Sequence, residues 1–435
     1  MSAIVAPSIP DAKQSMFAAL RSVNYRWYLG GQGITSVGSW MQRLAQDWLV
    51  LQVSHGDAVA LGITTACQFL PFLLLAPVAG VIADRYPRRR VLMVTSAVGA
   101  LAAAALALLT LAGTASVAAV YLVAFLLGSA AAVDHPTRQA FLSDVVDRPR
   151  LANAVALNSA VFNLSRIVGP ALAGLMIAAM SGVGGVFAVN ALSYVIAIAA
   201  LGRIQVGTRG PVDLRESVTF RAGLRYVADR RDLLLVLLAV AIAATFAFNF
   251  ATTTALMATG EFAVGAAAFG FMGTALSCGS IVGSLLAARR RSTPGLGLVL
   301  GSGVAFGALT MIAGLMPTYT AFLLVLPLCG VGALTFSVAA QSYLQTGTAG
   351  RMRGRVMGIY ALVFFGGNPV GGPLLGWVSN HWGPRWGLIG GGAAALLGLA
   401  ALALVWRRSR DQRACGAPRG YAAGTDAVNS RRIDV

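Results

Sequence analysis

Long apolar stretches separated by short polar segments run through the chain from residue 25 to residue 406. A helix needs about 20 apolar residues to cross the hydrocarbon core of a bilayer, and twelve stretches reach that length. Glycine and proline within them are compatible with membrane helices. The predicted spans cover residues 25–53, 58–83, 91–112, 116–141, 152–180, 185–202, 233–257, 264–288, 296–315, 319–344, 356–379 and 386–406.

The polar connections alternate in charge. Arginines cluster in the N-terminal arm, in the tail and after every even-numbered span, whereas the other connections contain only Arg385. Positive charge marks the cytoplasmic side of a membrane protein, and an even number of spans leaves both termini on one side. We therefore expect a multi-pass cell-membrane protein with both termini in the cytoplasm.

Composition agrees with a membrane protein, since 57% of the 435 residues are hydrophobic and 11% are charged. That proportion of charge excludes an ordinary soluble domain. The net charge of +18 would suggest a nucleic-acid partner in a soluble protein, but here the arginines follow the topology. We expect contact with the lipid bilayer and none with nucleic acid.

Several chemical functions are excluded by what the sequence lacks. Its four cysteines and three histidines have no metal-ligand spacing, and no paired carboxylates or nucleophile motif indicate an enzyme. Lys13 is the only lysine, so the chain has no phosphate-binding loop for ATP. No cofactor or metal is expected, and a transporter of this sequence would use an ion gradient. No selectivity-filter motif indicates a channel.

The two halves of the chain align at an offset of 203 residues. Gly80 then coincides with Gly283, and Pro170 with Pro373. Recurrence of arginine-rich loops alone would not explain these matches. We expect a bundle of six helices at 1–202, a cytoplasmic linker at 203–232, a second six-helix bundle at 233–406 and a cytoplasmic tail at 407–435. This all-α layout allows a substrate site between two halves that rock against each other.

The connection after the second span reads GVIADRYPRRRVLM. It is similar to the loop motif G-x-x-x-D-R-x-G-R-R of the major facilitator superfamily, with Pro87 where the family usually has glycine. The resemblance covers essentially the whole chain and implies the twelve-helix major facilitator fold. The matching residues are Gly80, Asp84, Arg85, Arg88 and Arg89.

In the fifth span, residues 165–174 read SRIVGPALAG and resemble the antiporter motif G-x-x-x-G-P-x-x-G-G of the same superfamily. Small residues beside a proline allow close helix packing, so we expect this span to contact the opposite half. Residues 36–52, 135–146 and 153–170 resemble segments of the drug:proton antiporter branch that includes macrolide and enterobactin exporters. The motif residues at issue are Gly169, Pro170, Ala173 and Gly174.

For Asp84 the resemblance implies a conformational latch. A carboxylate at this place accepts hydrogen bonds from Arg88 or from a helix N-terminus and holds the outward-facing state until those partners separate. Spacing alone is equally compatible with Asp84 moderating the charge of a basic loop.

Charged residues within the spans are candidates for proton coupling, because charges in a membrane are costly. Arg43 and Asp47 are four residues apart on the first span, and Arg166 reaches a similar depth on the fifth. Two interpretations stay open: a static Arg43–Asp47 ion pair, or an Asp47 that exchanges a proton or an arginine as access alternates.

The fourth span offers a second candidate group. Asp134 and Arg138 are one turn apart around Pro136, and His135 titrates near neutrality when unperturbed. These residues are either a proton site or an ion pair beside a proline kink. The spans of the second half contribute only neutral polar groups. Candidates for the substrate cavity are Gln46, Asn249, Phe250, Gln341 and Asn368.

The resemblance to the antiporter motif implies export, and with the observations above it favours a secondary transporter that exports hydrophobic or amphiphilic small molecules, such as drugs, antibiotics or siderophore-like metabolites, by proton antiport with alternating access. We expect a monomer whose partners are its substrate, protons and lipid. The alternatives are proton-coupled uptake of a metabolite and a membrane sensor or scaffold that transports nothing.

Overall fold

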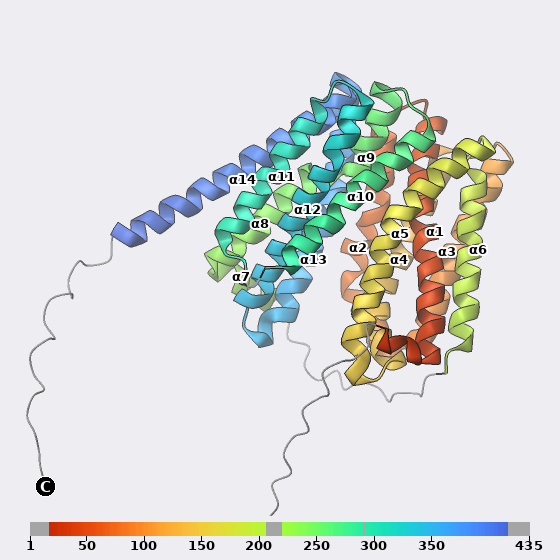
Figure 1. Ribbon diagram of the computed structural model, residues 1–435, viewed down its shortest axis with the longest axis horizontal. Helices are drawn as coiled ribbons and strands as arrows, with labels where there is room; N and C mark the ends of the chain where they lie inside the picture. The colour runs from red at the N-terminus through yellow and green to blue at the C-terminus, as the bar shows by residue number, and fades with distance from the viewer. Residues whose placement is uncertain (1–16, 206–219, 291, 416–435) are drawn as a thin grey trace, which may run out of the picture.

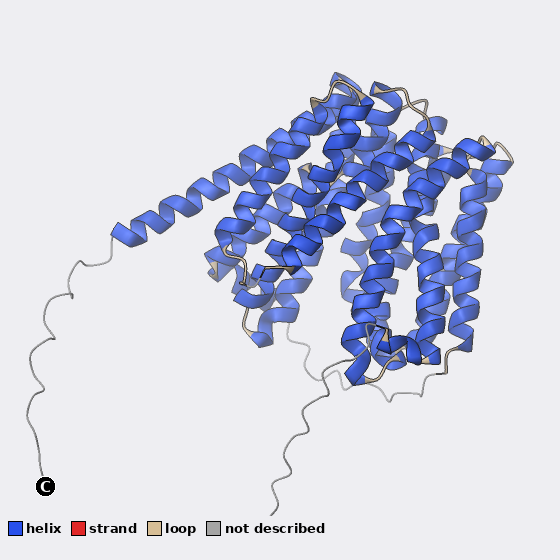
Figure 2. Ribbon diagram, in the orientation of Figure 1, coloured by secondary structure: helices blue, strands red, loops and turns tan. Residues whose placement is uncertain are grey.

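The computed structural model describes residues 17–205, 220–290 and 292–415. Within these ranges the regular structure is helical, with no strand (Figures 1 and 2). Eleven helices in the described residues are long and apolar enough to cross a membrane. The predictions for 1–16, most of the linker and 416–435 lie outside the described residues.

The first half begins with a short 3₁₀ turn, η1 (Ala18–Arg21). Another, η2 (Arg148–Arg150), precedes the fifth long helix. The six long helices are α1 (Val23–Val53), α2 (Ala58–Arg85), α3 (Arg88–Leu111), α4 (Val117–Val145), α5 (Leu151–Met180) and α6 (Gly184–Arg203).

The second half has more segments, because one span is divided. Its elements are α7 (Phe220–Asp229), α8 (Arg231–Phe246), α9 (Phe250–Leu256), the π-helical η3 (Met257–Glu261), α10 (Ala266–Ala288), α11 (Leu296–Gly314), α12 (Tyr319–Gly347), α13 (Gly350–Trp382) and α14 (Pro384–Cys415).

Side chains that accept hydrogen bonds from backbone N–H groups explain where several helices begin. The hydroxyl of Ser22 accepts from the N–H of Tyr25 at the start of α1, and Asp57 accepts from Val59 at the start of α2. Ser116 and Thr318 cap α4 and α12 in the same way. Each cap satisfies one of the backbone donors that a helix N-terminus leaves free.

Helix α1 forms at the first predicted span, 25–53. It is not among the eleven helices counted above, because it is less apolar than they are. It packs along α5 and α6 and also contacts α2 and α4, so much of its surface faces protein. Its polar residues therefore find protein neighbours, as when Gln46 donates a hydrogen bond to the carbonyl of Val120 (3.1 Å).

The seventh span differs from its prediction as a continuous helix at 233–257. Helix α8 ends at Phe246, and α9 begins at Phe250. The side-chain amide of Asn249 donates to the carbonyls of Ala244 and Thr245 (3.2 and 2.9 Å), which supplies a partner for backbone groups released by the break. Beyond α9 the span continues as η3, so hydrophobicity identified the span but not its interruption.

The predicted linker at 203–232 contains a helix in its described part. Its second part forms the amphipathic helix α7, whose Val227 is buried. This helix packs against α13, where a methyl group added at Gly223 would lie 3.0 Å from Cβ of Arg355. Arginine-rich composition concealed the apolar face that attaches α7 to the second bundle.

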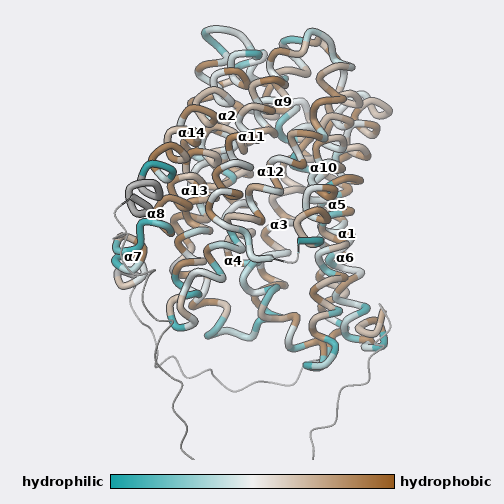
Figure 3. Tube along the Cα trace, turned by 60° about the vertical axis from the view of Figure 1, so that its left-hand side comes forward, coloured by the Kyte–Doolittle hydropathy of each residue, from teal (hydrophilic) through white to brown (hydrophobic). Residues whose placement is uncertain are grey.

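Helices α1–α6 pack among themselves, as do α8 and α10–α14, and this divides the molecule into two bundles (Figure 1). The arginine-rich turns after α2, α4, α10 and α12 lie at one end, called here the basic end. The other end is called the opposite end. Apolar residues dominate the middle, and hydrophilic ones gather toward the two ends (Figure 3).

The two bundles meet through two equivalent helix pairs, α2 with α13 and α5 with α10. The 203-residue offset relates these pairs, since it carries α2 onto α10 and α5 onto α13. Pro170 of α5 corresponds to Pro373 of α13, and both lie in an interface between bundles, Pro170 beside Gly270 and Pro373 beside Gly62, whereas Gly169 faces α1 within the first bundle. The internal repeat is therefore visible in the contacts.

Candidate functional site

The contact between α2 and α13 begins at the opposite end and stops partway along both helices. A Cβ added at Gly62 would lie 2.7 Å from Cα of Pro373, a separation that real side chains rarely reach. Farther along, one added at Gly366 would lie 3.3 Å from Leu73. Toward the basic end, one added at Gly358 meets nothing within 4 Å.

The α5–α10 contact follows the same course. A Cβ added at Gly174 would lie 3.1 Å from Cα of Gly270. The hydroxyl of Thr274 donates to the carbonyl of Ile167 (2.9 Å). Nearer the basic end, Arg166 donates to Ser280 (3.4 Å). The ribbons of the two bundles approach at the opposite end and diverge toward the basic end (Figure 1).

Polar contacts fasten the bundles together at the opposite end. The Asn380 side-chain amide donates to the Asp57 carboxylate (2.7 Å), and its carbonyl accepts from the N–H of Ala58 (2.9 Å). Deeper in the interface, the hydroxyls of Thr65 and Thr252 are 2.9 Å apart. These hydrogen bonds join segments from different bundles, so all of them must break if the bundles separate here.

Arg43 and Arg166 lie where the contact between bundles ends. Their guanidinium carbons are 5.1 and 5.6 Å from the centre of the same Trp40 ring, and Arg43 is also 5.4 Å from the ring of Phe69. Both arginines are half-buried. A guanidinium over an aromatic face gains a cation–π attraction, and it gains most where water is excluded.

Asp47 is buried, with 2% of its surface exposed, on the spanning helix α1. Its Oδ1 atom has no hydrogen-bond partner. In the described part of the chain no ion pair joins it to Arg43, whose guanidinium instead contacts Trp40 and Phe69. The predicted static Arg43–Asp47 ion pair is therefore absent from this conformation, although Arg43 still interacts electrostatically with both Asp47 and Arg166.

The second candidate group is internally paired. Asp134 forms an ion pair with Arg138 and accepts a hydrogen bond from Thr95 (2.8 Å), so α3 and α4 are joined here. His135 points elsewhere: it is exposed, and its ring lies 6.0 Å from that of Phe72 on α2. Asp134 and His135 thus have separate surroundings.

The loop motif after α2 lies at the basic end, and its predicted latch is not closed in this conformation. Asp84 is exposed and forms no ion pair within the described residues. Arg88 pairs with Asp144 of α4 instead (3.1 Å), and Arg89 donates to the carbonyl of Gly202 (2.6 Å). Gly80 and Arg85 are exposed near Asp84. In this conformation the motif joins helices of the first bundle only.

The candidates for the substrate cavity are dispersed. Gln46, Asn249 and Asn368 are buried, and Gln46 and Asn249 use their amides to bind backbone carbonyls. Phe250 packs 6.0 Å from Phe306 inside the second bundle, whereas Gln341 is exposed on α12. Among these five candidates, Asn249 alone has a buried side-chain atom without a hydrogen-bond partner, its Oδ1.

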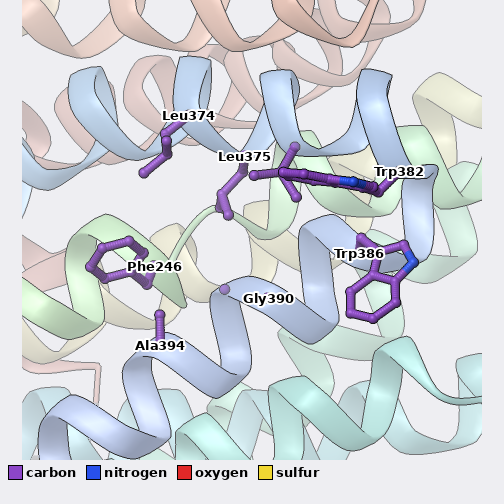
Figure 4. Close-up of a pocket in the computed structure, with 9 residues that line it drawn as sticks. Phe246, Leu374, Leu375, Trp382, Trp386, Gly390 and Ala394 are labelled. Atoms are coloured by element: carbon purple, nitrogen blue, oxygen red, sulfur yellow. The ribbon is translucent and has the colours of Figure 1, made fainter.

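An apolar pocket of about 460 Å³ lies between α8, α13 and α14, apart from the predicted residues (Figure 4). Phe246 borders it on one side and Trp382 and Trp386 on the other. The two tryptophans are exposed at the opposite end. Tryptophan is enriched at membrane interfaces, so this pocket has the character of a lipid-facing groove.

Sequence reasoning missed the partners of the arginines. Trp40 and Phe69 look like ordinary apolar residues of a span, and Ser280 is one of several serines on α10. Trp40 precedes Arg43 by three residues, a spacing that places both on one helix face and was the available signal. Phe69 and Ser280 come from other helices, so only tertiary structure reveals them.

Comparison with known proteins identifies the family. A profile of the transmembrane secretion effector family matches residues 14–420. The multidrug efflux pump Tap of Mycolicibacterium fortuitum is 30% identical over 81% of this chain and 87% of its own. The staphyloferrin A transporter of Staphylococcus aureus is 34% identical over 40% of this chain and 43% of its own.

Solved structures agree on the fold. A bacterial homologue of the human lysosomal transporter Spinster, crystallised in an inward-facing and occupied conformation, superposes with a TM-score of 0.68 and 13% identity. The match covers 92% of this chain and 98% of that one. The resemblance noted in the loop and antiporter motifs is thereby confirmed. The chain belongs to the transmembrane secretion effector family of the major facilitator superfamily.

Proposed function

We propose that this protein exports hydrophobic or amphiphilic small molecules, drug-like or siderophore-like, from the cytoplasm in exchange for protons. Support comes first from the family, whose relatives include a multidrug efflux pump and a staphyloferrin A transporter. The observation that carries the proposal is that the two bundles are in contact from the opposite end to partway along α2 and α13 and are apart toward the basic end. Such an arrangement gives a shared site access to one face of the membrane.

The basic end is the cytoplasmic end in this proposal, by the positive-inside rule. The conformation described is then the inward-facing one, in which a substrate reaches the inner limit of the bundle contact from the cytoplasm. Export requires the contacts at the opposite end to open and the basic end to close. The short α2–α13 and α5–α10 contacts, rich in glycine, suit a rigid-body rocking of one bundle against the other.

We assign proton coupling to Asp47. An ionised carboxylate buried in a membrane helix without a partner is costly, whereas a protonated one is neutral. Asp47 has this environment in the inward-facing conformation, while Asp134 already has Arg138 and Thr95 as partners. A change in the surroundings of Asp47 during rocking would therefore take up or release a proton.

Proteoliposomes with an imposed pH gradient test the proposal. The Asp47→Asn variant is expected to bind substrate and to lose export driven by the gradient. Wild-type export against its substrate gradient, coupled to proton entry, supports antiport. Co-directional movement of proton and substrate would instead favour uptake, and no flux at all would favour a sensor or scaffold.

The matched control is Asp144→Asn, which removes a carboxylate near the basic end that pairs with Arg88. This variant is expected to keep gradient-driven export above the level of Asp47→Asn. Normal export by Asp47→Asn would remove that residue from the coupling role and leave the exporter proposal standing.

A further inference from the structure

We infer that Arg43 and Arg166 form an anion-binding site, so that the preferred substrate carries a carboxylate or similar oxyanion beside an aromatic or apolar body. The inference rests on the proposed export function, because it assigns the class of substrate that the exporter takes. It concerns binding and gives these arginines a role different from pairing with Asp47.

The first observation is that neither arginine has a directly paired carboxylate, although the charge of Asp47 acts on Arg43 from one helical turn away. No described carboxylate forms an ion pair with Arg43 or Arg166. Arg43 donates no hydrogen bond within the described residues. Its side-chain nitrogen atoms are not among the buried atoms that lack a partner, so they remain accessible. Its donors are therefore open to an incoming group.

The second observation is the position of both residues within spanning helices. A guanidinium at this depth is costly and persists where it lines a polar path or receives a partner. Two such groups beside one Trp40 ring, with guanidinium carbons 5.1 and 5.6 Å from its centre, also act on each other as like charges. A bound anion between them would relieve both costs.

The third observation is the composition of the surroundings. The rings of Trp40 and Phe69 provide apolar faces beside Arg43, and a planar guanidinium is well suited to hold a carboxylate through two hydrogen bonds. The arginines belong to the first bundle, and Ser280, which accepts from Arg166, belongs to the second. An anion bound here contacts both bundles, so its binding can be linked to their rocking.

Direction of transport is consistent with an anion. The cytoplasm is electrically negative relative to the outside, so the electrical free energy of an anion falls when it leaves the cell. Export of an anion in exchange for a proton moves positive charge inward in both steps. The site therefore fits a membrane potential that favours export.

Equilibrium binding tests the inference without any transport step. The protein is reconstituted in nanodiscs and titrated with two fluorescent probes that share an aromatic body, dansylglycine with a carboxylate and dansylglycinamide without one. Empty nanodiscs correct for partitioning into lipid. The expected result is binding of dansylglycine about ten-fold tighter or more than of the amide, which is typical of hydrogen bonds to charged groups.

Variants localise the preference. Arg43→Gln and Arg166→Gln are each expected to reduce the preference for the carboxylate several-fold while leaving dansylglycinamide affinity unchanged. Arg43→Lys keeps the charge and is expected to keep part of the preference. Arg203→Gln is the matched control, since Arg203 also stacks on a tryptophan, 4.7 Å from the ring of Trp27 at the basic end, and should keep the full preference.

Three results would overturn the inference: equal affinity for the two probes, absence of binding of both, or a preference that survives both glutamine substitutions. A loss of affinity for the amide as well would indicate general misfolding and would count against a specific role. Flux measurements separate this result from the proposed function. Gradient-driven export without a charge preference contradicts only the anion site, whereas a preference without export contradicts the exporter and leaves the site.

Discussion

At the scale of single residues, similar charges have different roles according to their partners. Asp134 and Arg138 satisfy each other between α3 and α4, and Thr95 adds a hydrogen bond. Asp47 has no such partner at its Oδ1 atom. The side chain with an unmet electrostatic requirement is the better candidate for chemistry, and the paired side chain is the better candidate for stability.

The Asp134–Arg138 pair is expected to stabilise the first bundle. Asp134→Asn leaves Arg138 without its counter-charge and should lower stability by about 1–3 kcal/mol, measured by thermal unfolding in detergent. Asp134→Asn combined with Arg138→Gln should recover part of that loss and retain transport. A double variant that is stable but transports nothing would instead place Asp134 in the coupling machinery.

Asn380 is expected to hold the opposite end closed. Asn380→Ala removes hydrogen bonds to Asp57 and to the N–H of Ala58, each worth about 1 kcal/mol. The population open at this end should rise about 5- to 30-fold, seen as faster labelling of a cysteine placed at Thr252, which is buried between the bundles beside Thr65. Asn163→Ala, which removes a hydrogen bond within α5 only, should leave labelling unchanged.

The sequence could identify these residues but not their pairing. The i, i+4 spacing correctly places Arg43 and Asp47 on one face of α1, as it does Asp134 and Arg138 on α4. Only the second pair forms. Arg43 is drawn instead toward Trp40 and Phe69, and Phe69 comes from another helix, whose position no spacing within α1 reveals.

At the scale of helices, hydrophobicity and arginine position were sufficient to locate the eleven candidate spans, and also α1, which is less apolar. They were insufficient for the interruption at 247–249, because alanine and phenylalanine keep that segment apolar while Asn249 binds the freed carbonyls. The same limit applies to α7, because the average hydrophobicity of this arginine-rich segment does not reveal the helix face on which Val227 is buried. Interruptions and surface helices depend on local hydrogen bonding and packing, which an average over a span does not record.

The glycines in the two interfaces are expected to set how closely the bundles approach. Gly372→Val should push α13 away from α2, reduce transport severalfold and increase labelling of a cysteine at Thr252, which is buried between the bundles. Gly358→Val on the same helix is the control, since a Cβ there meets no atom within 4 Å. Gly270→Val in the equivalent pair should reproduce the effect of Gly372→Val, and a lack of effect in both would separate these contacts from gating.

At the scale of the whole molecule, the internal repeat predicts a motion in which each bundle moves as a rigid body. Distances between spin labels test it in a variant without native cysteines. Labels at Arg148 and Arg351, one on each bundle at the basic end, should come closer when the transporter turns outward. Labels at Ser181 and Ala263, at the opposite end, should separate under the same condition.

A pair within one bundle provides the control for that experiment. Tyr86 and Arg148 both lie at the basic end of the first bundle, so their distance should stay constant while the distances between bundles change in opposite directions. Contacts at the opposite end and contacts at the basic end cannot both form if each bundle is rigid, and the two changes must therefore be anticorrelated. Simultaneous shortening at both ends, or a large change within the first bundle, would mean that helices bend individually and that rocking is not the route of access.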